Sequence, residues 1–179
     1  MVKVYSEKLV SNFKGNIIDI ETIGNFLSYE DSRKYKNIIP VIFGFINNKG
    51  IKIFCAKNRV SIPKIKKNII KLLPSLEKPF YAFNTDFERG VLFHTLKREI
   101  NFDKELNLEK FEAKRNAVHF LKIPHYKDPF DDNGLLCSQA WLKGEFESAI
   151  LHNRSCLLKE RDILLKRGFR EPDKLEFVK

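Results

Sequence analysis

Two carboxylates lie two residues apart in an apolar segment near the N-terminus. Asp19 and Glu21 occur in the sequence IIDIETIG, which we expect to form a β-strand. Side chains two apart on a strand point to the same face, where two carboxylates repel each other unless a cation neutralises them. The pair therefore predicts a site for an oxygen-preferring divalent ion. The alternative is an edge strand whose polar face is exposed to solvent and binds no ion.

A second acidic cluster, Asn84-Thr85-Asp86-Phe87-Glu88, follows an expected strand over 79–83 and opens an expected helix. Asn84 or Asp86 can cap that helix, and acidic side chains in a first turn interact favourably with the helix dipole. Capping accounts for Asp86 fully and for Glu88 mostly. It leaves Glu88 as a candidate third carboxylate for the same cation.

A third cluster lies in the last long helix that the sequence predicts. His152, Cys156 and Glu160 are spaced four residues apart, so they share one face of that helix. An imidazole titrates near neutral pH and can take or give a proton during catalysis. The alternative for His152 is a histidine that is buried and hydrogen-bonded within the core.

Taken in order, these clusters resemble the three motifs of the DEDD 3′–5′ exonucleases. The matching residues are Asp19-Ile20-Glu21, Asn84 to Glu88, and His152-Asn153-Arg154. Within that superfamily the likeness is greatest to the YprB-type ribonuclease H-like group, and it spans about residues 16–165. It implies a ribonuclease H-like fold and hydrolysis of DNA or RNA phosphodiester bonds with two Mg²⁺ or Mn²⁺ ions.

The resemblance also implies roles for individual residues. Asp19 and Glu21 become metal ligands of the first motif, with Asp19 bridging the two ions. Glu88 stands where the family usually has Asp, and its longer side chain still offers an oxygen. His152 becomes the residue that orients or deprotonates the attacking water.

One position departs from the family pattern. The fourth carboxylate should follow the histidine by one helical turn, but this chain has Cys156 there and Leu157 at the stricter spacing. A thiolate is a poor ligand for Mg²⁺. Glu160, about 6 Å beyond Cys156 along the helix axis, is the candidate replacement. Other candidates are the loop acids Asp128, Asp131 and Asp132.

The charge of the chain suggests a polyanionic partner. Lys and Arg number 33 against 23 Asp and Glu, a net charge of +10 that favours binding to nucleic acid. Between Pro63 and Pro74 the apolar spacing predicts an amphipathic helix with a Lys-rich outer face. We expect the partner to be a single-stranded DNA or RNA end. The residues expected to contact it are Lys64, Lys67, Lys71, Asn84, Phe87 and Arg154.

The pattern of apolar runs and turns predicts one α/β domain over residues 1–179, with a mixed sheet covered by helices. Three early strands are expected to form an antiparallel portion, which together with the resemblance gives a ribonuclease H-like sheet. The expected strands are 16–20, 40–46, 51–56, 79–83 and 117–123. The expected helices after the Lys-rich one are 86–100, 134–143 and 145–167, and 125–134 is expected to be an exposed loop.

Several classes of protein are disfavoured by composition. No run approaches the roughly 18 apolar residues that span a bilayer, and the N-terminus lacks the pattern of a secretory signal. Three widely spaced cysteines argue against a disulfide scaffold and a Cys-rich zinc site, so a reducing cytoplasm is the expected location. A second functional hypothesis is a catalytically inactive ribonuclease H-like module that binds nucleic acid, because Cys156 replaces the fourth carboxylate.

Overall fold

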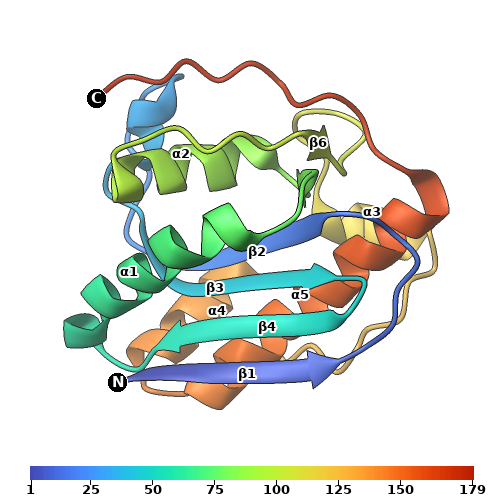
Figure 1. The fold of residues 1–179 in the computed structure, drawn as a ribbon, viewed down its shortest axis with the longest axis horizontal. Coiled ribbons are helices and arrows are strands. Elements are labelled where there is room, and N and C mark those ends of the chain that lie inside the picture. The colour runs from blue at the N-terminus through green and yellow to red at the C-terminus, as the bar shows by residue number, and fades with distance from the viewer.

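A six-stranded mixed sheet with the strand order β1-β4-β3-β2-β5-β6 forms the centre of the computed structural model, which describes residues 1–179 (Figure 1). The strands β1 to β4 pair antiparallel, whereas β2, β5 and β6 run parallel to one another. The strand bounds are Val2–Lys8, Asn16–Ile23, Ile39–Asn47, Gly50–Ala56, Phe80–Ala82 and Lys104–Glu105.

Helices cover both faces of this sheet, and Figure 1 shows α1 and α2 in front of it with α4 and α5 behind. The front helices are α1 (Ile62–Leu72) and α2 (Thr85–Leu96). The other three are α3 (Lys114–Phe120), α4 (Gly134–Leu142) and α5 (Phe146–Arg167). Since α5 packs against β2, β3 and β4, its residues reach the face of the sheet on which the first carboxylate pair lies.

The predicted α/β class, four of the five predicted strands and all four predicted helices are confirmed. Two strands were missed. β1 is a half-exposed edge strand whose sequence, VKVYSEK, has few apolar residues to mark it. β6 has only two residues, too few to give any periodic signal.

The strand expected over 117–123 is wrong, because Lys114–Phe120 forms helix α3. The segment AVHFLKI is rich in apolar residues, yet only Ala117 and Ile123 are buried and Phe120 is 79% exposed. The β6 edge of the sheet is occupied, because Glu105 of β6 already pairs with Arg170 of the C-terminal segment. The apolar content therefore does not translate into strand pairing.

The core forms one cluster of 38 buried apolar residues on both faces of the sheet. Gly44 of β3 allows α5 to approach closely, since a Cβ atom there would lie 2.0 Å from Oδ1 of Asn153. None of the helices has both the length and the apolar character that crossing a bilayer requires.

Candidate functional site

The three clusters that the sequence singles out meet in one cavity of about 400 Å³. Its walls come from β2, the start of α2, and the helices α3 and α5. The predicted site residues that line it are Asp19, Glu21, Asn84, Phe87, Glu88, His152 and Glu160. Lys114, Asp132 and Cys156 line it as well.

Strand pairing explains why the first two clusters are neighbours. β2 and β5 run parallel, with Ile17 paired to Tyr81, so the chain leaves β5 beside Asp19. Asn84 then occupies the N-cap position of α2, although its side chain makes no capping hydrogen bond. The first turn of α2 brings Glu88 into the cavity, where the carboxylate is buried.

Asn153 fixes the first carboxylate pair from the side of α5. Its Nδ2 donates to Oδ2 of Asp19 at 2.7 Å and lies 3.5 Å from Oε1 of Glu21. The absence of a side chain on Gly44 makes room for this amide. Asn153 therefore holds the Asp19 carboxylate in place, a role that its position next to His152 did not reveal.

Lys114 supplies a cation that sequence reasoning missed. Its Nζ lies 3.1 Å from Oδ1 of Asp19 and 2.5 Å from Oε1 of Glu160. The ammonium also lies 5.8 Å from the centroid of the Phe83 ring. No signal pointed to it, because the helix that carries Lys114 was itself not predicted.

His152 is held by a buried carboxylate from the loop before α4. Its Nδ1 lies 2.7 Å from Oδ1 of Asp128, and its Nε2 faces Oε1 of Glu21 at 3.8 Å. Lys159 neutralises Asp128 at 2.7 Å, and neither of these two side chains is exposed. The expectation of an exposed loop over 125–134 is wrong at Asp128, which is buried. Its charge is paired with His152 and Lys159 of α5, and it accepts two backbone N–H bonds from its own loop.

The protonation states of this cavity are strongly perturbed. Burial raises the pKa of Glu21 to about 7 and that of Glu160 to about 8. Burial, together with the charges of Asp19 and Glu160, also raises the pKa of Glu88 well above its usual range. Without a further cation, Glu21, Glu88 and Glu160 therefore keep their protons to a higher pH than a free glutamate does.

For the pKa of His152, the neighbouring charges outweigh the effect of burial. Burial alone would lower the pKa of His152, but the charges of Glu21 and Cys156 and the hydrogen bond with Asp128 raise it to about 12. Burial likewise opposes ionisation of Asp128, yet the hydrogen bonds from His152 and Lys159 hold its pKa well below the usual range. His152 and Asp128 thus form a charged pair, and the imidazole of this pair faces Glu21.

The cavity offers several carboxylate oxygens as possible ligands for a divalent cation. Oε2 of Glu88 and Oε2 of Glu160 are both buried and have no hydrogen-bond partner, although buried polar atoms are normally paired. Both carboxylates line the cavity together with Asp19 and Glu21. Carboxylate oxygens are the ligands that Mg²⁺ and Mn²⁺ prefer. No three of these four carboxylates, however, present oxygens within 4.8 Å of one another.

Arg154 lies outside this cavity and is engaged elsewhere. Its guanidinium binds Glu7 of β1 through two bonds of 2.5 and 2.9 Å. Asp86 also points away, toward Arg89 and Lys110. The expectation that Arg154 meets a phosphate at this site is therefore wrong, because the arginine tethers α5 to the edge strand.

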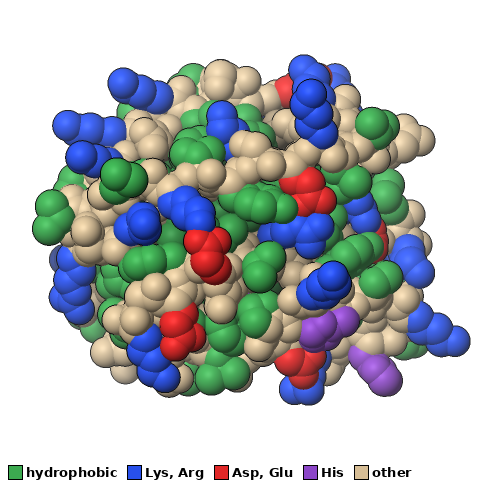
Figure 2. Space-filling view, turned by 90° about the horizontal axis from the view of Figure 1, so that it is seen from below, with side chains coloured by type: hydrophobic (Ala, Val, Ile, Leu, Met, Phe, Trp, Pro, Cys, Tyr) green, Lys and Arg blue, Asp and Glu red, His purple; other side chains and the backbone are tan.

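The basic residues expected to bind the strand are not beside the cavity. The three lysines are exposed on α1, which lies across the sheet from α5; they are Lys64, Lys67 and Lys71. Figure 2 shows one face of the molecule, where Lys and Arg side chains are spread among acidic and apolar ones, and two His side chains lie together near one edge. The positive charge visible there does not form one continuous patch.

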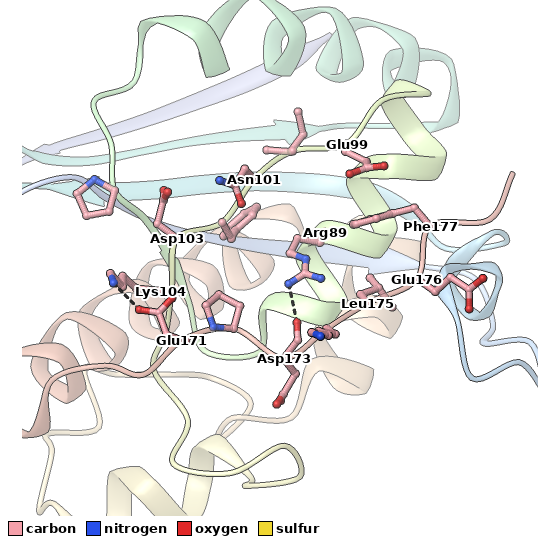
Figure 3. Close-up of a pocket in the computed structure, with 15 residues that line it drawn as sticks. Arg89, Glu99, Asn101, Asp103, Lys104, Glu171, Asp173, Leu175, Glu176 and Phe177 are labelled. Atoms are coloured by element: carbon pink, nitrogen blue, oxygen red, sulfur yellow. Dashed lines mark hydrogen bonds and ion pairs between the residues drawn. The ribbon is translucent and has the colours of Figure 1, made fainter.

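A larger cavity, about 980 Å³, lies between α2, β6 and the C-terminal segment (Figure 3). Two of its charged side chains are engaged with that segment. Arg89 donates to the backbone carbonyl of Asp173, and Lys104 pairs with Glu171. It contains no convergent carboxylate and histidine groups, so we place the candidate chemistry at the smaller cavity.

Comparison with known proteins gives no match, whether with protein-family models, with curated proteins or with solved structures.

Proposed function

We propose that this protein is a metal-dependent nuclease that hydrolyses phosphodiester bonds of DNA or RNA, acting as a 3′–5′ exonuclease. The observation that carries the proposal is the convergence of four carboxylates and a histidine in one cavity. Asp19, Glu21, Glu88 and Glu160 come from three separate elements and surround the same space as His152. Two of the four carry buried oxygens with no hydrogen-bond partner.

We also propose that the sheet is ribonuclease H-like and the site of DEDD type. Support comes from the order of the motifs on the elements. The first motif lies on β2, which joins the antiparallel and parallel portions of the sheet. The second begins α2 directly after β5, and the third lies on α5.

Within this proposal each residue has a separate task. Divalent ions, when bound, stabilise the charge on the attacking and leaving oxygens. Asp19 and Glu21 hold the cation, and the amide of Asn153 keeps Asp19 in position. Asp128 orients His152 so that its Nε2 faces the cavity, where it can exchange a proton with water.

Substrate enters this cavity beside the start of α2. Asn84 is exposed there and Phe87 is partly exposed, so an amide and an aromatic ring border the opening. A flat aromatic side chain can stack on a base without regard to sequence. The proposed substrate is therefore a single-stranded end.

The proposal is tested by incubating 5′-labelled single-stranded DNA and RNA with the wild-type protein and Mn²⁺, Mg²⁺ or EDTA. We expect a ladder of products that requires the metal and shortens from the 3′ end. Intact substrate in every lane, from a folded protein, would contradict nuclease activity.

A second candidate function is a nucleic-acid-binding module without catalysis. The ion pairs of Lys114 with Asp19 and Glu160 favour it, because the ammonium neutralises two carboxylates that a metal would otherwise use. This alternative predicts salt-sensitive binding of the same oligonucleotides without any cleavage.

A further inference from the structure

Cys156, which breaks the family pattern, lies beside two other metal-ligating side chains. Its Sγ is 3.7 Å from Nε2 of His152, and that nitrogen is 3.8 Å from Oε1 of Glu21. The three ligand atoms all lie within 4.8 Å of one another, and all three residues are buried. The four-residue spacing on α5 places the thiol and the imidazole on one face, opposite the carboxylate of β2.

Two of these three separations are close to the edges of a tetrahedral metal site. Zinc binds nitrogen and oxygen at about 2.0–2.1 Å and sulfur at about 2.3 Å, which gives ligand-to-ligand edges of about 3.3–3.5 Å. The observed 3.7 and 3.8 Å exceed those edges by only a few tenths of an ångström. Small side-chain rotations would close the site around an ion.

The histidine is already oriented as a ligand. Because Nδ1 bonds to Asp128 at 2.7 Å, Nε2 is the nitrogen that faces Glu21 and Cys156. A carboxylate behind a metal-binding imidazole is the usual outer-shell arrangement at zinc sites. Lys159 balances the charge of Asp128, so that carboxylate orients the ring without itself needing the ion.

A separate observation points to a cation in this cavity. The buried oxygen Oε2 of Glu88, on the adjoining wall, has no hydrogen-bond partner. Lys114 forms its ion pairs with Asp19 and Glu160, and none with Glu88 or Glu21. An ion that binds the imidazole and the thiol displaces the protons that both groups carry in the metal-free protein.

We propose that Glu21, His152 and Cys156 form a binding site for one zinc-type transition-metal ion, in preference to Mg²⁺. Thiolate and imidazole ligands select such ions, whereas Mg²⁺ takes oxygen ligands. Asp19, Glu88 and Glu160 remain as oxygen ligands for a second, harder ion. While an ion occupies this site, Nε2 of His152 is a ligand and cannot exchange a proton with water. The inference therefore concerns metal binding and does not depend on the proposed function.

The test is an absorption titration of the tag-free, metal-stripped wild-type protein with Co²⁺, a spectroscopic substitute for zinc. Cobalt bound to a thiolate gives a sulfur-to-metal charge-transfer band in the near ultraviolet. We expect this band to saturate at one equivalent of Co²⁺, to disappear when Zn²⁺ is added, and to persist in a large excess of Mg²⁺.

Variants identify the ligand that produces the band. We expect Cys156→Ser to abolish it, whereas Cys137→Ser and Cys55→Ser, which replace the other two buried free cysteines, keep it. We expect Glu21→Gln to weaken Co²⁺ binding at least tenfold. Absence of the band in folded wild-type protein, or its survival in Cys156→Ser, would overturn the proposal.

The same samples separate this inference from the nuclease proposal. A cobalt–thiolate band in a protein that cleaves no oligonucleotide would support the metal site and contradict the nuclease. Cleavage that depends on Mg²⁺ or Mn²⁺ in a protein that gives no such band would support the nuclease and contradict the metal site.

Discussion

The ammonium of Lys114 lies 3.1 Å from a carboxylate oxygen of Asp19, so a lysine from α3 neutralises the first acidic residue of the cavity. The same nitrogen is 2.5 Å from Glu160 on α5. Lys114 thus links α3 to β2 and α5 through two ion pairs. A metal ion bound by Asp19 or Glu160 must share these oxygens with it.

Replacing Lys114 by Met should expose this competition. In EDTA we expect Lys114→Met to lose about 3 kcal/mol of stability, the low end for a broken buried ion pair, since the lysine side chain is 18% exposed. Mn²⁺ should restore the loss and raise the melting temperature of the variant more than that of wild type. The matched control is Lys110→Met, which removes a more exposed lysine that pairs with Asp86. Equal Mn²⁺ shifts in all three proteins would rule out the shared site.

Stability without metal should fall as the pH rises. An unfolded Glu titrates near about 4.3, whereas the folded pKa is about 7 for Glu21 and about 8 for Glu160. Between those limits the folded protein binds more protons than the unfolded chain, so the free energy of unfolding decreases with rising pH. His152, with its raised pKa, acts in the same direction above about pH 6.5.

Urea denaturation in EDTA at about pH 5 and about pH 8 measures this effect. We expect a loss on the order of a few kcal/mol in wild type, and a smaller loss in Glu21→Gln, which cannot ionise at that position. A free energy of unfolding that rises between the two pH values would show that the carboxylates are not held protonated.

Asp128→Asn should impair catalysis through His152. The amide cannot balance the imidazolium, and it can favour the wrong ring tautomer, so we expect kcat to fall about 10- to 100-fold with KM little changed. Asp131→Asn is the matched control, because Asp131 is exposed and pairs with Arg115. Steady-state cleavage kinetics compare the two. A kcat for Asp128→Asn equal to that of the control would contradict a role for Asp128 in catalysis.

Much of the carboxylate cluster was predictable because its signals are local. Asp19 and Glu21 interrupt an apolar strand, and Glu88 follows a short buried one, so each residue marks its own position. Helical spacing likewise placed Glu160 on the face of His152. The structure brings all of these residues to one cavity, as expected.

The partners of these residues could not be predicted, because they depend on tertiary packing. Lys114 belongs to a helix whose sequence resembles a strand, and Asp128 to a loop rich in turn residues that looks solvent-exposed. The role of Arg154 was mispredicted because its position in the motif suggested a contact that the tertiary structure does not make. It lies within the third motif, but the helix turns it toward Glu7 on a strand that gave no clear signal.

Arg154→Gln should therefore affect stability and spare activity. Removing a two-bond ion pair that is partly exposed should cost up to about 1 kcal/mol in unfolding free energy, and cleavage should stay within about twofold of wild type. Chemical denaturation and cleavage rates on one preparation check both parts. A large loss of activity with unchanged stability would instead indicate that Arg154 contacts the substrate.

The most direct test of the central claim compares Asp19→Asn with Asp86→Asn in the metal-dependent cleavage assay. Both changes remove one buried carboxylate charge, but only Asp19 lines the cavity, whereas Asp86 faces Arg89 and Lys110. We predict that Asp19→Asn lowers the cleavage rate by at least about 1000-fold, on the order of 4 kcal/mol of lost transition-state stabilisation, while Asp86→Asn stays within a few-fold of wild type. Cleavage by folded Asp19→Asn at the wild-type rate would contradict the assignment of this cavity as the active site.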